Sequence, residues 1–169
     1  VEWFGKSLDA EWKTDKKLNA TVAKVKVGKT PVTLVLPETF MNNSGKSLKP
    51  LITSIKSAEK LMVIYDDLDL PFRTNKISFN KSSGGHRGLE SIIKSIKTEK
   101  FARVRVGISP TTPSGKIKKP KGEDAVTKAI LGKFNEEEIK ELKKLSKSVN
   151  EALEVFVSEG LEKAMTGFN

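Results

Sequence analysis

Hydrophobic and polar positions alternate with a period of two in one part of the chain, which predicts a β-hairpin. Between Thr21 and Val27 every second residue is small or apolar, and Lys24 and Lys26 lie between them. A second β-rich run follows at 32–36, after a turn at 28–30. Strict alternation is typical of strands with one wetted face, so these two runs should pair.

Other stretches carry apolar residues at helical spacing. We expect helices over residues 1–8, over 48–55 with Pro50 in the first turn, and over 89–96. Two more helical stretches should close the chain. The second begins at an Asn135 cap with Glu138 three residues on, and Gly160 should end it.

The run 61–65 is continuously apolar, which predicts a parallel strand that is buried on both faces and ends at Asp66. Further strands are expected at 76–79 and 101–108, and a loop at 111–122. Strands that alternate with helices indicate an α/β fold, a single domain over 1–169 in which one mixed β-sheet is flanked by helices.

The net charge of the chain indicates which kind of molecule it could bind. The chain has 31 Lys and Arg against 21 Asp and Glu, a formal net charge of +10. Such a field attracts polyanions, above all nucleic acid. There is no cysteine, so disulfides and thiolate zinc sites are excluded. No apolar run is long enough for a membrane helix, and no secretory signal is visible at the start.

Three polar segments could carry chemistry. Asp66, Asp67 and Asp69 follow the apolar strand and could be a solvated turn, or could orient a histidine or hold a metal. The glycine-rich stretch 83–88 opens a helix, where an anion such as phosphate binds well, although an ordinary glycine turn would look the same. It holds His86, the only histidine, so a metal site with two histidines is excluded.

The third segment, 40–45, places Asn42 beside Phe40 and Met41, an amide next to an apolar wall that could bind a peptide or ester carbonyl. An Asn-Ser-Gly helix cap explains the same residues, and we favour it from the pattern alone. Among the basic residues, Arg103 and Arg105 share a strand face, and Lys76 and Lys81 lie near the glycine stretch; all four are candidate anion contacts.

Four segments, in their order and spacing, resemble the bacterial-type peptidyl-tRNA hydrolases: Pro37–Gly45, Tyr65–Pro71, Gly84–Leu89 and Phe101–Ile108. The likeness runs from about Val1 to Gly167. It implies a monomeric α/β enzyme, with no metal or cofactor, that hydrolyses the ester joining a peptide to the 3′ end of tRNA.

The resemblance also implies roles for residues. Asp66 matches the catalytic aspartate that orients the base histidine, and Asn42 matches the asparagine that binds substrate near the scissile carbonyl. His86 matches a second histidine that lines the peptide-binding cleft, and Arg87 stands where asparagine is usual. The implied substrate-binding set is Phe40, Met41, Asn42, His86 and Arg87, and the tRNA-binding set is Lys76, Lys81, Arg103 and Arg105.

One family feature has no counterpart in this sequence. Members begin with a buried strand, an Asn-Pro loop and a Thr-Arg-His-Asn stretch that supplies the base histidine. We therefore expect the general base to be missing from these residues, and a catalytically inactive RNA-binding protein of the same fold, like a splicing factor, is the alternative. A complete bacterial form would be cytoplasmic, and an organellar form would carry a mitochondrial leader in the absent stretch.

Overall fold

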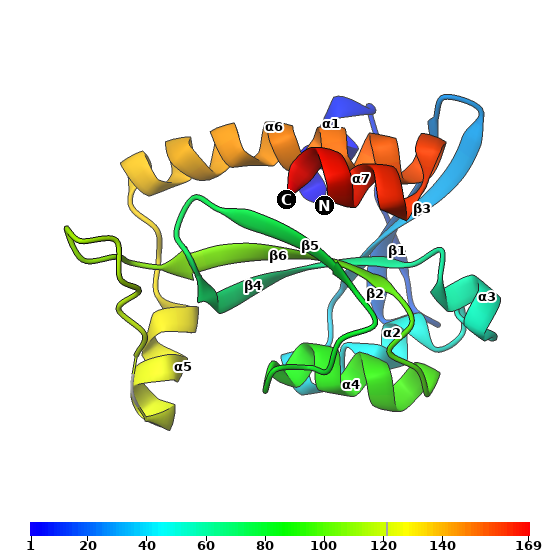
Figure 1. The fold of residues 1–169 in the computed structure, drawn as a ribbon. Coiled ribbons are helices and arrows are strands. Elements are labelled where there is room, and N and C mark those ends of the chain that lie inside the picture. The colour runs from blue at the N-terminus through cyan, green and yellow to red at the C-terminus, as the bar shows by residue number, and fades with distance from the viewer. Residues whose placement is uncertain (121) are drawn as a thin grey trace.

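A computed structural model describes residues 1–120 and 122–169 (Figure 1). The strands are β1 Lys13–Asp15, β2 Ala20–Val27, β3 Thr30–Pro37, β4 Met62–Pro71, β5 Asn75–Phe79 and β6 Ala102–Ser109. The helices are α1 Glu2–Ser7, the 3-10 turn η1 Met41–Asn43, α2 Gly45–Leu48, α3 Ile55–Ala58, α4 Arg87–Ile96, α5 Glu123–Leu131, α6 Glu136–Glu159 and α7 Leu161–Phe168. The α/β class is confirmed, but the strands form two three-stranded sheets where one was expected.

The first sheet contains the predicted hairpin. β2 and β3 pair antiparallel along their whole length, and Gly28 makes the turn with φ +57°, a conformation that glycine adopts without strain. β1 adds a third strand beside β2. It was not predicted because Lys13, Thr14 and Asp15 show no apolar alternation.

The single helix predicted over 48–55 is wrong. The structure has two short helices, α2 and α3, and Pro50 follows the end of α2 instead of lying in a first turn. Proline has no N–H to donate, and its ring collides with the carbonyl four residues earlier, so a helix rarely continues through it. Ser54 then starts α3 with a reciprocal capping box to Ser57.

The second sheet has the order β4-β6-β5, with β4 parallel and β5 antiparallel to the central β6. Two expectations for β4 are wrong. The strand does not end at Asp66 but runs on to Pro71, with a shift of register between Asp67 and Pro71. Its residues are half-buried because, within the described residues, β4 pairs with β6 alone and lies at the edge of the sheet.

Helices cover both faces of this sheet, with α4 on one side and α6 on the other (Figure 1). α6 begins at the predicted capping box, in which Asn135 Oδ1 accepts from the Glu138 N–H at 2.9 Å and Glu138 Oε2 accepts from the Asn135 N–H at 2.8 Å. It ends at Gly160, as predicted, and α7 follows. The predicted loop at 111–122 is present over its described residues, and residue 121 lies outside them.

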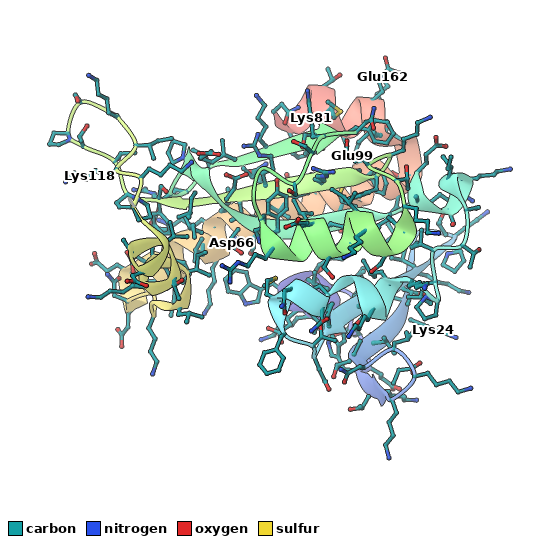
Figure 2. All side chains as sticks on the ribbon, turned by 90° about the horizontal axis from the view of Figure 1, so that it is seen from below. Lys24, Asp66, Lys81, Glu99, Lys118 and Glu162 are labelled. Carbon is teal, nitrogen blue, oxygen red and sulfur yellow. The ribbon has the colours of Figure 1, made fainter. Side chains whose placement is uncertain are left out.

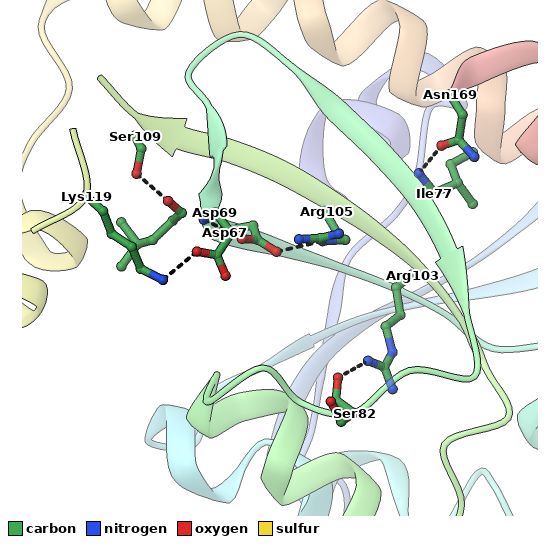
Figure 3. A network of polar contacts seen from close by, with 10 residues as sticks. Asp67, Asp69, Ile77, Ser82, Arg103, Arg105, Ser109, Lys119 and Asn169 are labelled. Carbon is green, nitrogen blue, oxygen red and sulfur yellow. Dashed lines mark hydrogen bonds and ion pairs between the residues drawn. The ribbon is translucent and has the colours of Figure 1, made fainter. Parts of the chain in front are cut away.

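Each face of the second sheet packs on its own hydrophobic cluster. Ile77 and Val104 face α6 and α7, whereas Val63 and Phe101 face α4 and α2. The C-terminal residue closes the outer edge of β5, because Asn169 Oδ1 accepts the backbone N–H of Ile77 at 2.6 Å (Figure 3). In the part of the chain that the structure describes, no helix is long and apolar enough to cross a membrane.

Candidate active site

The three carboxylates of β4 each have a partner. Asp66 Oδ1 lies 3.4 Å from His86 Nε2. Figure 3 shows the other two pairs: Asp67 Oδ2 accepts from Arg105 Nε at 2.7 Å, and Asp69 pairs with Lys119. The interpretation of this segment as a solvated turn is therefore wrong. Neighbouring carboxylates at this end of β4 instead have different partners.

His86 joins Asp66 to the start of α4. It is the N-cap of that helix, and its Nδ1 accepts the backbone N–H of Leu89 at 3.2 Å. Nδ1 therefore holds the lone pair, and in the neutral ring Nε2 carries the hydrogen that points to Asp66. The ring also meets Tyr65 edge to face, with centroids 4.9 Å apart. Figure 2 shows Asp66 beside this end of α4.

This arrangement limits what His86 can do. Its basic lone pair already caps a helix, so accepting a proton from water would cost the cap. The capping role could not be predicted, because histidine is not among the usual N-cap residues. The cap also removes one donor from the anion site expected at 83–88, because the His86 side chain accepts the Leu89 N–H.

The contact with His86 changes the acidity of Asp66. The hydrogen bond to His86 lowers the pKa of the Asp66 carboxyl, against a smaller opposing effect of burial. A carboxyl whose pKa is lower in the folded state stabilises the fold above its unfolded pKa of about 3.9. That contribution is lost as the pH falls through the folded pKa.

Removing the imidazole should separate these two effects. In His86→Ala we expect the pKa of Asp66 to rise toward its ordinary value and the fold to lose about 1 kcal/mol through the missing cap. His86→Asn restores a cap acceptor but is too short to reach Asp66, so it should recover stability without lowering the pKa. Carboxyl NMR titration and urea unfolding measure the two quantities. An unchanged Asp66 pKa in His86→Ala would contradict the assignment.

The turn η1 brings the predicted substrate segment to α4. A Cβ placed on Gly88 would lie 2.5 Å from Met41 Sδ and 2.9 Å from His86 Cε1, so both side chains flank that glycine. Asn42, in the middle of η1, is exposed, and Phe40 is 85% exposed. The turn therefore presents exposed apolar side chains and an exposed amide near His86.

The helix cap that we favoured for Asn43–Gly45 is absent. Ser44 precedes α2, but its hydroxyl donates back to the Met41 carbonyl at 2.8 Å and caps no N–H of the helix. Gly45 lies against α4 instead, where its N–H donates to Ser91 Oγ at 3.1 Å. The segment is thus held by α4, with η1 beside the start of that helix.

Arg105 and Lys76 lie side by side. They are register partners in β6 and β5, so they project from the same face of the sheet. Lys76 is exposed, whereas Arg105 is held by Asp67, whose hydrogen bond raises the pKa of the guanidinium. Tyr65 lies near this pair, and burial together with the charge of Asp67 raises the pKa of its hydroxyl.

The prediction that Arg103 contacts tRNA is wrong. Its side chain is buried, with 1% of the residue exposed, because β6 is the central strand. Its guanidinium lies 4.5 Å from the ring centroid of Phe101 and donates to the carbonyls of Lys81 and Ser82. Lys81 and Arg87, by contrast, are exposed, Arg87 as the first residue of α4.

The described residues contain no group of three or more Asp, Glu, His or Cys side chains placed to hold a metal ion. The described residues also line open clefts. One of about 470 Å³ is lined by Asn19, Glu38, Thr39, Phe40, Asn43 and Lys46. Another, of about 580 Å³, lies between Arg73 and α6, among residues for which we predicted no site.

Comparisons with known proteins agree on one family. The family model described as Peptidyl-tRNA hydrolase matches residues 1–169. A peptidyl-tRNA hydrolase of Herpetosiphon aurantiacus is 42% identical over 156 residues, which cover 91% of this chain and 71% of the relative. One from Aquifex aeolicus is 38% identical over 167 residues, which cover 96% and 82%. The crystal structure of peptidyl-tRNA hydrolase from Acinetobacter baumannii matches with a TM-score of 0.85 and 25% identity, over 99% of this chain and 81% of that chain.

Proposed function

Because the chain belongs to the peptidyl-tRNA hydrolase family, we propose that it hydrolyses the ester bond between a peptide and tRNA, which recycles tRNA from aborted translation. The observation that carries this proposal is the meeting of Asp66 with His86 at the start of α4, against which the η1 turn packs. A carboxylate, a histidine and an exposed amide thus surround one surface.

The reaction adds water across the ester. The water oxygen bonds to the carbonyl carbon, the bond to the ribose 3′ oxygen breaks, and the proton taken from water ends on the tRNA hydroxyl. A general base must accept that proton in the meantime. In this proposal the base is the family's histidine, which has no counterpart among residues 1–169. Asp66 orients that histidine and stabilises its charged form, as a carboxylate beside a histidine does in other hydrolases.

The remaining residues bind substrate. We assign Asn42 to the scissile carbonyl, Phe40 and Met41 to the apolar part of the peptide, and His86 and Arg87 to the wall of the cleft. His86 does not serve as the base, since its Nδ1 lone pair caps α4. The tRNA backbone lies along Lys76, Lys81 and Arg105.

The proposed substrate also bears on partners and location. Apart from the base, one chain contains every residue assigned above, so we propose that the protein acts as a monomer. Peptidyl-tRNA is formed where translation takes place, so we propose the cytoplasm as the site of action of a bacterial form and the mitochondrion as that of an organellar form.

The direct test is release of labelled peptide from peptidyl-tRNA, with tRNA binding measured on the same sample. Release supports the proposal. Binding without release would favour the inactive RNA-binding alternative, and neither binding nor release would overturn both.

Lys76 offers a separate test of the tRNA surface. Lys76→Gln should weaken tRNA binding and reduce the slope of log affinity against log salt by about 0.9, because one phosphate contact is lost. Lys24→Gln is the matched control. Lys24 is exposed on β2 and lies far from Asp66 in Figure 2, so its replacement should leave the slope unchanged. Equal slopes for the two variants would exclude Lys76 from the tRNA surface.

A further inference from the structure

A buried arginine holds the loop that joins β5 to α4. Arg103 Nη1 donates to the Ser82 carbonyl at 2.7 Å (Figure 3). Its Nη2 donates to the Lys81 carbonyl. Both acceptors are backbone atoms of the loop 80–85, and the donor lies in the central strand of the sheet. Arg103 therefore fixes the backbone of this loop relative to β6, the central strand of the sheet.

Few other described hydrogen bonds hold this loop. The Gly85 N–H donates to Ser83 Oγ and the His86 N–H to the Ser83 carbonyl, and both bonds stay within the segment. Asn80, Gly84 and Gly85 all have positive φ, and a Cβ on either glycine would meet nothing within 4 Å. The loop thus has little packing of its own, and its position depends on the two bonds from Arg103.

The chemistry at this position suits arginine. A planar guanidinium can donate to two carbonyls at once while its face lies on the Phe101 ring, whereas a lysine ammonium cannot reproduce that fork. Burying a cation among neutral acceptors is costly, and burial lowers the pKa of Arg103. A methionine would fill similar space at less desolvation cost but could hold neither carbonyl.

We propose that Arg103 is a positioning residue for tRNA binding: by holding the carbonyls of Lys81 and Ser82, it places the Lys81 ammonium where it contacts the tRNA backbone. This inference rests on the proposed function. Arg103 itself, being buried, touches no substrate. Its effect passes through the loop.

A double-mutant cycle tests this route. Arg103→Met and Lys81→Ala should each weaken tRNA binding about fivefold, because each removes one ordered phosphate contact. The double variant should also lose about fivefold, not the roughly 25-fold product of independent effects. The KM for peptidyl-tRNA should rise with kcat nearly unchanged, and hydrogen exchange should speed up in 80–86 but not in α6.

Controls separate positioning from folding and from charge. Arg73→Met removes an exposed cation at the turn between β4 and β5 and should leave tRNA binding unchanged. If Arg103→Met fails to fold, Arg103→Lys keeps the charge and should still loosen the loop and weaken binding.

Three outcomes would overturn the inference. These are parental binding in a folded Arg103 variant, full multiplication of the two losses, or unchanged exchange in 80–86. A parent protein that binds no tRNA would instead refute the proposed function itself, while the exchange measurement still reports whether Arg103 holds the loop.

Discussion

In a protein that includes the base histidine, Asp66→Asn should lower the turnover of peptidyl-tRNA by about 100- to 10,000-fold, the usual contribution of general base catalysis. Asparagine keeps the shape of the side chain but removes the charge that stabilises a protonated base. The proposed tRNA surface, along Lys76, Lys81 and Arg105, does not include Asp66, so affinity for tRNA should change by less than about twofold. Single-turnover release and tRNA titration measure the two effects separately.

Asp69→Asn provides the matched control. It makes the same chemical change three residues along β4, at a carboxylate that is 55% exposed and paired with Lys119. Exposed ion pairs contribute little, so turnover should stay within about threefold of the parent. Full turnover in Asp66→Asn, or an equal loss in both variants, would remove Asp66 from the proposed mechanism.

Gly107→Ala should destabilise the fold by about 3 kcal/mol and reduce turnover with it. Gly107 lies in β6 beside the bulge of β4, and an added Cβ would overlap the Pro71 carbonyl oxygen. The obstacle is backbone, which cannot move aside as the end of a flexible side chain can. The bulge, which lies between Asp67 and Pro71, would have to shift, and Asp66 directly precedes it. Urea unfolding measures the loss.

Gly167→Ala makes the same substitution where there is room. Gly167 lies within α7, and an added Cβ would meet nothing within 4 Å. Alanine is the better helix former by about 0.8 to 1 kcal/mol, so this variant should be at least as stable as the parent. Parental stability in Gly107→Ala would show that the bulge tolerates a methyl group.

The elements that the sequence predicted well are those whose signal is local. The period-two hairpin, the helix after the glycine-rich stretch and the capping box at Asn135 each follow from residues close together in the chain. The failures depended on tertiary context. The helix predicted over 48–55 rested on the spacing of apolar residues alone, and that spacing does not show that the helix stops before Pro50. The residues before Asp66 give no sign that β4 continues as a bulged edge strand.

For the candidate site, too, the sequence identified residues but not the contacts that depend on tertiary structure. The sequence singled out Asp66 and His86, but their approach and the cap that His86 makes depend on how α4 packs, 20 residues further along. Arg103 and Arg105 look equivalent on one strand face. The sheet order separates them, because β6 is central and the loop 80–85 covers Arg103 while Arg105 meets the carboxylate of Asp67.

The two outer edges of the second sheet differ in whether their backbone groups have hydrogen-bond partners. Asn169 caps the edge of β5, but the edge of β4 is unpaired among the described residues. The free N–H and C=O groups along such an edge can hydrogen-bond a further strand, whereas on the β5 side the N–H of Ile77 already has a partner. Any strand added to this sheet would therefore pair beside β4, the strand that carries Asp66.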